Sequence, residues 1–146
     1  MTESKLTANQ FSLKGSVAVV TGASRGIGKV ISKGLYDAGA TVHGVARSPS
    51  PLGVIFENER YRYHSADVTD MASVNLLAKE LKQGHSFVDI LVNAAGISVP
   101  SGGPQDSVQG FDSIIQVNLV ATYRMTTALR PMFSRGSSVI NIGSLG

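Results

Sequence analysis

A glycine-rich segment near the start of the chain has the composition of a phosphate-binding turn. Residues 21–28 read T-G-A-S-R-G-I-G, and they lie between an apolar run at 17–20 and an amphipathic stretch. This order predicts a strand, a tight turn and the first turn of a helix, whose backbone N–H groups would face a dinucleotide pyrophosphate. Gly22 and Gly26 would adopt positive φ values, and Gly28 would let helix and strand approach closely. The residues predicted to hold the pyrophosphate are Gly22, Ser24, Gly26, Ile27 and Gly28.

Two arginines indicate which dinucleotide would bind. The predicted second strand ends near residue 46, about where a dinucleotide site places the residue that reads the ribose. An acidic residue there would favour the free 2′-hydroxyl of NAD, but this chain has Ala46 and then Arg47, while Arg25 lies within the glycine turn. Arginine binds phosphate through paired, charge-assisted hydrogen bonds, so the two residues favour the 2′-phosphate of NADP. The alternative is that both are ordinary solvated arginines.

Polar residues also follow the later predicted strands, at the edge where an open α/β sheet binds ligands. Asp67 could accept hydrogen bonds from an adenine amino group, or it could be a turn or capping residue. Asn93 and Gly96 could line a ligand site or belong to a simple loop. Ser144 comes directly after the predicted fifth strand, and taken alone it is more typical of a loop serine.

Asn118 lies on the predicted buried stripe of a long helix, so we expect it to be buried. The other residues of this stripe are Phe111, Ile114, Ile115, Leu119, Thr122, Met125 and Leu129. An unpaired buried amide costs about 1–3 kcal/mol, which means that Asn118 either makes structural hydrogen bonds or organises a polar site. The chain's histidines, His43, His64 and His85, are scattered without the spacing of metal ligands. They are interpreted as structural or solvated residues, and no metal site is predicted.

Taken together, these motifs resemble the short-chain dehydrogenases/reductases, and within that family the 3-oxoacyl-ACP reductase type. Residues 21–28 are similar to the family's T-G-x-x-x-G-I-G turn, and Asn93-Ala94-Ala95-Gly96 is similar to its N-A-A-G motif. Asp67-Val68 resembles its adenine-contacting pair. Asn118 and Ser144 match the asparagine and the serine of its catalytic tetrad. The five motifs occur in the family's order and cover nearly all of the chain from residue 13 onward.

The resemblance implies a role for each of these residues. Asp67 and Val68 would contact the adenine, and residues 93–96 would line the inner ribose and the nicotinamide. Asn118 would hold a water in a proton relay, and Ser144 would hydrogen-bond the substrate oxygen as charge develops there. The implied reaction is a reversible hydride transfer between NADP and a small-molecule carbonyl or secondary alcohol.

The resemblance also implies a Y-x-x-x-K motif about a dozen residues after the serine, whose tyrosine would move the proton. The 146 residues stop two residues after Ser144, and none of the 4 tyrosines is followed four residues later by a lysine. Since a general acid/base contributes about 10²- to 10⁴-fold, we expect the chain as it stands to be a catalytically incompetent fragment or truncated form. The alternatives are a non-catalytic dinucleotide-binding or interaction module, and a fragment that does not fold alone.

Strand and helix signals alternate from residue 17 onward, and they give the elements that must position these residues. We predict strands at 17–20, 41–46, 61–66, 88–93 and 137–143, with loops at 47–60 and 94–110. Helices are predicted after the glycine turn up to Gly39, between an Asp70 N-cap and Gly84, and from about 111 to 133. The predicted inner faces of the first two helices comprise Ile27, Val30, Ile31, Leu35 and Ala38, and Met71, Val74, Leu77, Ala78 and Leu81.

The fold class is therefore α/β: a Rossmann-type doubly wound parallel sheet. With the resemblance, its strand order is 3-2-1-4-5 and it lacks the family's last two strands. Residues 1–14 would form a polar N-terminal arm, and residues 15–146 an incomplete NAD(P)-binding domain. In the full-length family the long helix packs against a partner subunit, which implies a homo-oligomeric parent and poor solubility for this chain.

The composition argues against several other classes of function. Hydrophobic residues make up 42% of the chain and charged residues 16%, as in a globular protein. The net charge of +3 is spread out, so nucleic-acid binding is not predicted. The absence of cysteine excludes disulfides and fits a cytoplasmic protein, without excluding an organelle. No apolar run approaches the roughly 20 residues of a membrane span, and no signal peptide is predicted.

Overall fold

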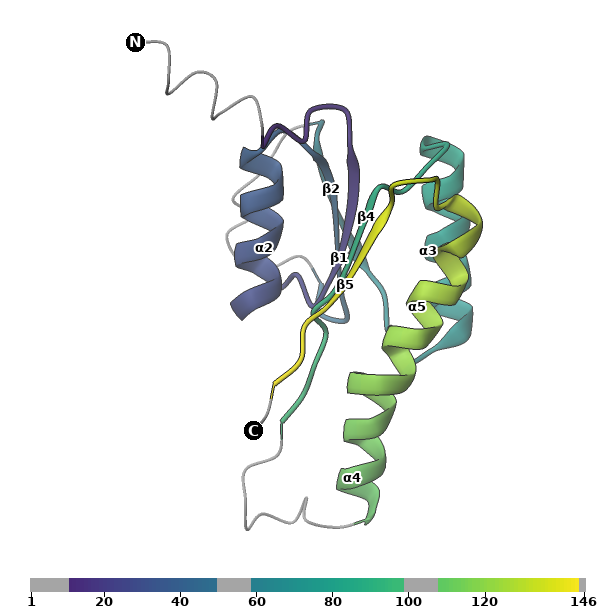
Figure 1. The fold of residues 1–146 in the computed structure, drawn as a ribbon. Helices are drawn as coiled ribbons and strands as arrows, with labels where there is room; N and C mark the ends of the chain where they lie inside the picture. Colours follow the sequence, from purple (N-terminus) through teal and green to yellow (C-terminus); the bar gives the residue numbers. More distant parts are fainter. Residues whose placement is uncertain (1–10, 50–58, 99–107, 145–146) are drawn as a thin grey trace.

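The structure is a computed structural model, and it describes residues 11–49, 59–98 and 108–144. Within these residues a five-stranded parallel sheet has the order β3-β2-β1-β4-β5, which confirms the predicted α/β fold and strand order. Helix α2 covers one face, and α3 and α5 cover the other (Figure 1). The strands are β1 (Val17–Thr21), β2 (Thr41–Ala46), β3 (Tyr61–Ser65), β4 (Ile90–Asn93) and β5 (Ser138–Asn141).

The strand ends differ slightly from the predicted ones. The fourth strand was predicted to begin at Val88, but the ladder of β4 begins at Ile90. Of the two preceding residues, Val88 donates its N–H to the Met132 carbonyl, outside the sheet, while the Asp89 N–H still donates to the Val17 carbonyl of β1, each at 2.9 Å. Most of the predicted arm, and parts of the two predicted loops, lie outside the described residues.

The helical segments are α2 (Gly26–Asp37), α3 (Met71–Gly84), α4 (Val108–Ile115), η1 (Gln116–Val120), α5 (Ala121–Leu129) and η2 (Arg130–Met132). The last four follow one another directly, with η1 a π-helical turn and η2 a 3₁₀ turn. The predicted long helix is therefore present, but it begins earlier than residue 111. The prediction that Gly84 lies beyond its helix was wrong, because Gly84 is the last residue of α3.

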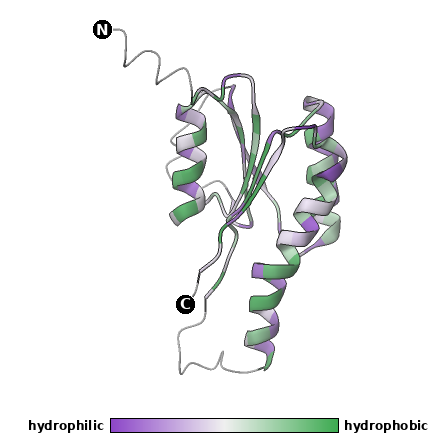
Figure 2. Cartoon of the chain, in the orientation of Figure 1, coloured by the Kyte–Doolittle hydropathy of each residue, from purple (hydrophilic) through white to green (hydrophobic). Residues whose placement is uncertain are grey.

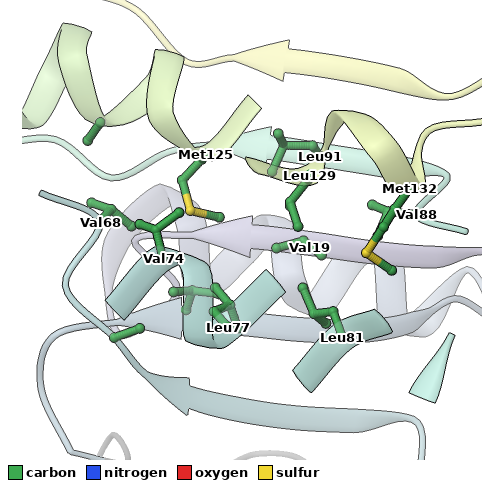
Figure 3. Close-up of a cluster of buried hydrophobic side chains, with 13 residues drawn as sticks. Val19, Val68, Val74, Leu77, Leu81, Val88, Leu91, Met125, Leu129 and Met132 are labelled. Carbon is green, nitrogen blue, oxygen red and sulfur yellow. The ribbon is translucent and has the colours of Figure 1, made fainter. Parts of the chain in front are cut away.

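Two clusters of buried side chains hold the helices on the sheet. Alternate side chains of β1 point to the two faces of the sheet, as the two-residue period of a strand requires. On the α3 and α5 face, Val19 packs with Leu77, Leu81, Met125 and Leu129 (Figure 3). On the α2 face, the cluster comprises Ala18, Val20, Val42 and Val92 of the sheet with Ile31 and Leu35 of the helix.

Only part of the predicted inner face of α2 is buried. Ile27 is 62% exposed and Val30 is 71% exposed, so their predicted core positions were wrong. The buried residues of α2 are instead Gly28 and Ser32, because the helix approaches the strands along its smallest side chains. Met71 of α3 is exposed as well.

The helical rod extends beyond the sheet. Figure 1 shows α4 lying past the carboxyl ends of the strands, and Figure 2 shows that this segment carries hydrophobic residues. Phe111 and Leu119, both predicted to lie on a buried stripe, are exposed. The stripe is buried only where the rod crosses the sheet, at Met125 and Leu129.

Candidate functional site

The carboxyl ends of β1, β2, β3 and β4 border a cavity of about 920 Å³. It is lined by segments that follow these four strands, since the carboxyl ends of parallel strands meet at one edge of a sheet. With the exception of Asn93, every residue predicted to bind the cofactor lines it. These residues are Gly22, Ser24, Arg25, Gly26, Ile27, Gly28, Arg47, Asp67, Val68, Ala94, Ala95 and Gly96.

The cavity wall also contains residues that the sequence did not single out, among them Ser48, Thr69, Ile97 and Val117. The first three are sequence neighbours of predicted site residues, so proximity along the chain could have indicated them. Val117 belongs to η1 and comes from a distant part of the chain. No local signal marks it.

The glycine turn has the predicted geometry. Gly22 and Gly26 have φ values of 69° and 54°, in the left-handed region that favours glycine. A Cβ atom on Gly22 would lie 2.6 Å from the Ala94 carbonyl oxygen, and one on Gly28 would lie 2.4 Å from the Gly22 carbonyl oxygen. The turn therefore packs tightly both against the start of α2 and against the loop after β4.

Thr21 joins the two sides of the cavity. Its buried hydroxyl accepts hydrogen bonds from the Ala94 N–H at 3.1 Å and the Ala95 N–H at 3.0 Å. The glycine turn and the loop after β4 are thereby held together by a single side chain. Thr21 is the first residue of the predicted turn motif, but its spacing alone predicts no separate role for it.

The amino-terminal end of α2 lies in the cavity, where Gly26 and Gly28 are part of the wall. The N-cap residue, Arg25, has an extended backbone and its side chain makes no capping hydrogen bond. In α3, by contrast, the predicted N-cap Asp70 accepts hydrogen bonds from the Ala72 and Ser73 N–H groups. The first N–H groups of α2 and the positive end of its dipole are thus suited to an anion in the cavity.

Side chains of β3 fix the loop that follows β2. The Tyr63 hydroxyl donates to the Ser48 carbonyl at 2.8 Å, and the Ser65 hydroxyl donates to the Arg47 carbonyl at 3.3 Å. Because both carbonyl groups are turned toward β3, the backbone that carries Arg47 is held at the cavity edge.

Asp67 is a charged group of the cavity wall. Its Oδ1 atom accepts hydrogen bonds from the Thr69 N–H at 2.8 Å and the Thr69 hydroxyl at 2.7 Å, which is the turn role considered for it. Partial burial acts to raise the pKa of the Asp67 carboxyl, but the Thr69 hydrogen bonds and the charge of Arg47 outweigh it and lower this pKa. The carboxylate is therefore ionised at neutral pH.

Asn93 faces away from the cavity. It is buried, and its amide nitrogen donates to the Asn141 Oδ1 atom at 2.9 Å and to the Thr126 hydroxyl at 3.3 Å. These bonds join β4 to β5 and to α5. The structure thus gives Asn93 a place inside the sheet rather than in the cavity wall.

Asn118 lies in the π-helical turn η1. It is exposed, so the prediction of a buried asparagine was wrong, because this part of the rod projects past the sheet. Both ends of its amide are nevertheless hydrogen-bonded: Oδ1 accepts from the Ile97 N–H and Nδ2 donates to the Ile97 carbonyl, both at 2.9 Å. Asn118 therefore braces the cavity wall at Ile97 without lining the cavity itself.

Ser144 follows β5 and is exposed. It does not belong to the cavity wall either. Among the described residues, no cluster of histidine, cysteine, aspartate or glutamate is arranged to hold a metal ion. No helix in the described part of the chain is both long and apolar enough to cross a membrane.

The chain is similar to known proteins of one family. Residues 16–146 match the family described as short chain dehydrogenase. The chain is 38% identical over 139 residues to the 3-oxoacyl-[acyl-carrier-protein] reductase FabG of Vibrio harveyi, a match that covers 92% of this chain and 57% of that protein. It is 35% identical over 138 residues to the 2-dehydro-3-deoxy-D-gluconate 5-dehydrogenase of Pseudoalteromonas atlantica, covering 90% and 54% of the two proteins.

Solved structures agree with these matches. The Pseudomonas aeruginosa RhlG/NADP active-site complex superposes with a TM-score of 0.76 at 33% identity, over 92% of this chain and 56% of that one. The chain thus spans little more than half the length of these relatives. Because the family match runs from residue 16 to residue 146, the chain belongs to the short-chain dehydrogenase family.

Proposed function

We propose that this chain is the NADP-binding part of an oxidoreductase that transfers hydride between the nicotinamide and a carbonyl or secondary alcohol. The observation that carries the proposal is the cavity of about 920 Å³, whose wall combines the glycine turn, Arg25, Arg47 and Asp67. The similar RhlG structure is an NADP complex, which supports the choice of cofactor.

The glycine turn would hold the pyrophosphate. The N–H groups at the start of α2 are not capped by the Arg25 side chain, so phosphate oxygens would satisfy them. The absence of side chains at Gly22 and Gly28 keeps the turn close to its neighbours, within distances that a Cβ atom would violate. This geometry fits a ligand that approaches the backbone itself.

Arg25 and Arg47 would bind the 2′-phosphate. Both belong to the cavity wall, and the residue before Arg47 is Ala46 rather than an acidic residue. The hydroxyl of Ser48, also in the wall, adds a further donor. The bonds from β3 to the Arg47 and Ser48 carbonyls would reduce the entropy lost when this loop binds phosphate.

The other end of the cavity would accommodate the rest of the cofactor. Asp67 uses Oδ1 for Thr69, so its Oδ2 atom would accept from the adenine amino group, with Val68 beside it. Residues 94–96 would line the inner ribose and the nicotinamide. The bound cofactor supplies the hydride, and the protein positions it.

Asn118 and Ser144 would serve the reacting end of the site. The amide of Asn118 is held by Ile97 of the cavity wall. Asn118 would hold a water of the proton relay. Ser144 would hydrogen-bond the substrate oxygen as negative charge develops on it. The proton would be moved by a tyrosine and lysine pair, whose spacing does not occur in these 146 residues.

Thermal unfolding with each dinucleotide tests the proposal. NADP at about 100 times its Kd should stabilise the chain by about 2.7 kcal/mol, and NAD should stabilise it less. The variant Arg47→Asp should lose most of the NADP effect and respond better to NAD. The charge-matched control is Arg135→Asp, at an exposed turn before β5, and it should behave like the unmodified chain.

Three outcomes would contradict different parts of the proposal. An unchanged preference in Arg47→Asp would contradict the 2′-phosphate assignment alone. A cooperative melt that neither dinucleotide raises would contradict the binding site, and the lack of any cooperative melt would mean that the chain does not fold alone.

A further inference from the structure

The chain's 3 histidines, far apart in the sequence, meet in one hydrogen-bonded cluster. His43 lies at the centre: its Nδ1 is 2.9 Å from His64 Nε2, and its Nε2 is 2.8 Å from His85 Nε2. At one end of the row, His64 Nδ1 lies 3.3 Å from the Glu80 Oε2 atom. His43 is only 4% exposed and the His64 side chain 9%, so the contacts are largely shielded from water.

The histidine cluster joins a helix to the sheet. His43 lies on β2, and His64 lies diagonally across on β3, where the register pairs it with Val45. Glu80 and the C-cap residue His85 belong to the carboxyl-terminal end of α3. Together with Leu81, which is buried in the core cluster, these polar bonds therefore connect the last turns of α3 to the sheet. None of the three histidines lines the cofactor cavity.

The arrangement suits protons rather than a metal ion. His43 directs its two ring nitrogens to different partners, so a single ion could not be bound by all three rings at once. Each nitrogen–nitrogen contact instead requires one proton, because two N–H groups would repel and two lone pairs would form no bond.

The position of each proton follows from the Glu80 carboxylate. His64 donates from Nδ1 to Glu80, so its Nε2 accepts from His43 Nδ1–H. His43 Nε2 must then accept from His85 Nε2–H. In the neutral cluster, therefore, His43 and His64 carry their protons on Nδ1 and His85 carries its proton on Nε2.

This bond pattern limits how many protons the folded chain can take up. Five of the six ring nitrogens either carry a proton already or accept a hydrogen bond through their lone pair. The sixth, His85 Nδ1, can take up a proton while both contacts remain intact. The folded cluster can therefore bind one additional proton, and a second would break a contact. In the unfolded chain the three histidines titrate separately near pH 6.5 and take up three. At acidic pH the intact cluster thus binds about two fewer protons than the unfolded chain.

We propose that the histidine cluster is a pH-sensitive contact that fastens the carboxyl-terminal end of α3 to the sheet near neutral pH and releases it as the pH falls below about 6. A second proton cannot enter without breaking one of the two contacts. The rings then separate, and the end of α3 beyond the buried Leu81 is released from the sheet. This proposal does not depend on the identity of the cofactor.

The surroundings of the rings also disfavour protonation of the folded cluster. Burial, together with the neighbouring His64, His85 and Arg62, lowers the pKa of His43 to about 3. Burial also lowers the pKa of His64; Glu80 on α3 opposes this effect and Arg62 on β3 adds to it. Because these pKa values lie below the unfolded value of 6.5, the stabilisation is complete above pH 6.5 and is lost as the pH falls toward 3.

Urea unfolding between pH 7.5 and pH 5 measures the proton difference. Between pH 6 and pH 5, the unmodified chain should take up about two protons on unfolding, and its unfolding constant should rise about 50-fold. In His43→Phe neither ring contact exists, so this limit on proton uptake is removed and the rise should be much smaller, although the variant is less stable at pH 7.5. In His85→Gln the side-chain amide can turn its oxygen to accept from a protonated His43 Nε2. The folded cluster can then take up one proton and the unfolded chain two, so the difference should fall to about one. The control Lys82→Gln, on the same helix end, should leave the slope unchanged.

Nitrogen-15 NMR of the histidine rings at pH 7.5 gives a test that needs no variant. It should show Nδ1–H for His43 and His64 and Nε2–H for His85. Two N–H groups or two lone pairs at either ring contact, or equal pH slopes in the unmodified chain and His43→Phe, would overturn the proposal. So would stabilisation by zinc that depends on His43, or the absence of cooperative unfolding at pH 7.5.

Discussion

Tyr63 is a residue of β3 that holds the loop carrying Arg47 in place. Its hydroxyl donates to the Ser48 carbonyl at 2.8 Å. The variant Tyr63→Phe removes this bond, which should make the ordered conformation of the loop less stable by about 0.5–1.5 kcal/mol. NADP should therefore bind about twofold to tenfold more weakly, with little change for NAD. Calorimetric titration of both dinucleotides measures the difference. Tyr123→Phe, an exposed tyrosine on α5, is the matched control, and an equal loss for NAD would contradict the expected role.

Residues whose function depends on local spacing could be predicted from the sequence. Gly22 and Gly28 belong to one short motif, and the structure shows the φ value and the close contacts that such a motif requires. The histidine cluster could not be predicted in the same way. Whether His43 and His64 meet depends on the register of β2 with β3, which no local pattern of residues encodes.

At the scale of single elements, substitution by alanine should have opposite effects on stability at two glycines of α2. A Cβ atom on Gly28 would lie 2.4 Å from the Gly22 carbonyl oxygen, whereas one on Gly34 would meet nothing within 4 Å. Gly28→Ala should therefore destabilise the chain by about 2 kcal/mol or more through overpacking against backbone. Gly34→Ala should stabilise it by about 0.5–1 kcal/mol, because alanine is the better helix former. Urea unfolding checks both values, and similar stabilities for the two variants would show that the turn and α2 are not packed as described.

The long helical rod shows what periodicity predicts and where it fails. The apolar repeat correctly predicted a helix that includes Met125 and Leu129, which are buried on the sheet. The same repeat predicted burial of Leu119 and Asn118, both of which are exposed. A period of 3.6 residues defines a face, but the length of the sheet decides how much of that face is covered, and the π-helical turn at 116–120 shifts the face further.

For the molecule as a whole, β5 is one of the two edge strands of the described sheet, and it is exposed. It pairs with β4 on one side, and Ile140 is 46% exposed. An edge strand of this kind promotes association, so the mean mass of the purified 146-residue chain should rise with concentration in sedimentation experiments. Ile140→Lys should reduce the association, while Gln109→Lys, which adds the same charge on α4, should not. A chain that stays monomeric at all concentrations would contradict this expectation.

The order of the strands could be predicted because helices and strands alternate and the motifs resemble a family whose topology is known. The shape of the cofactor cavity depends in addition on distant contacts. Thr21 holds the loop after β4, and Val117 closes the wall from the helical rod. Both contacts arise only when the whole sheet has formed.

The central claim is that NADP binds at the carboxyl edge of this sheet, and an NMR titration of the backbone amides tests it most directly. On addition of NADP, saturable shift changes should concentrate in the four segments of the cavity wall: 22–28, 45–48, 66–69 and 94–97. The amides of the histidine cluster should change little. The absence of saturable changes, or changes centred outside these segments, would contradict the account.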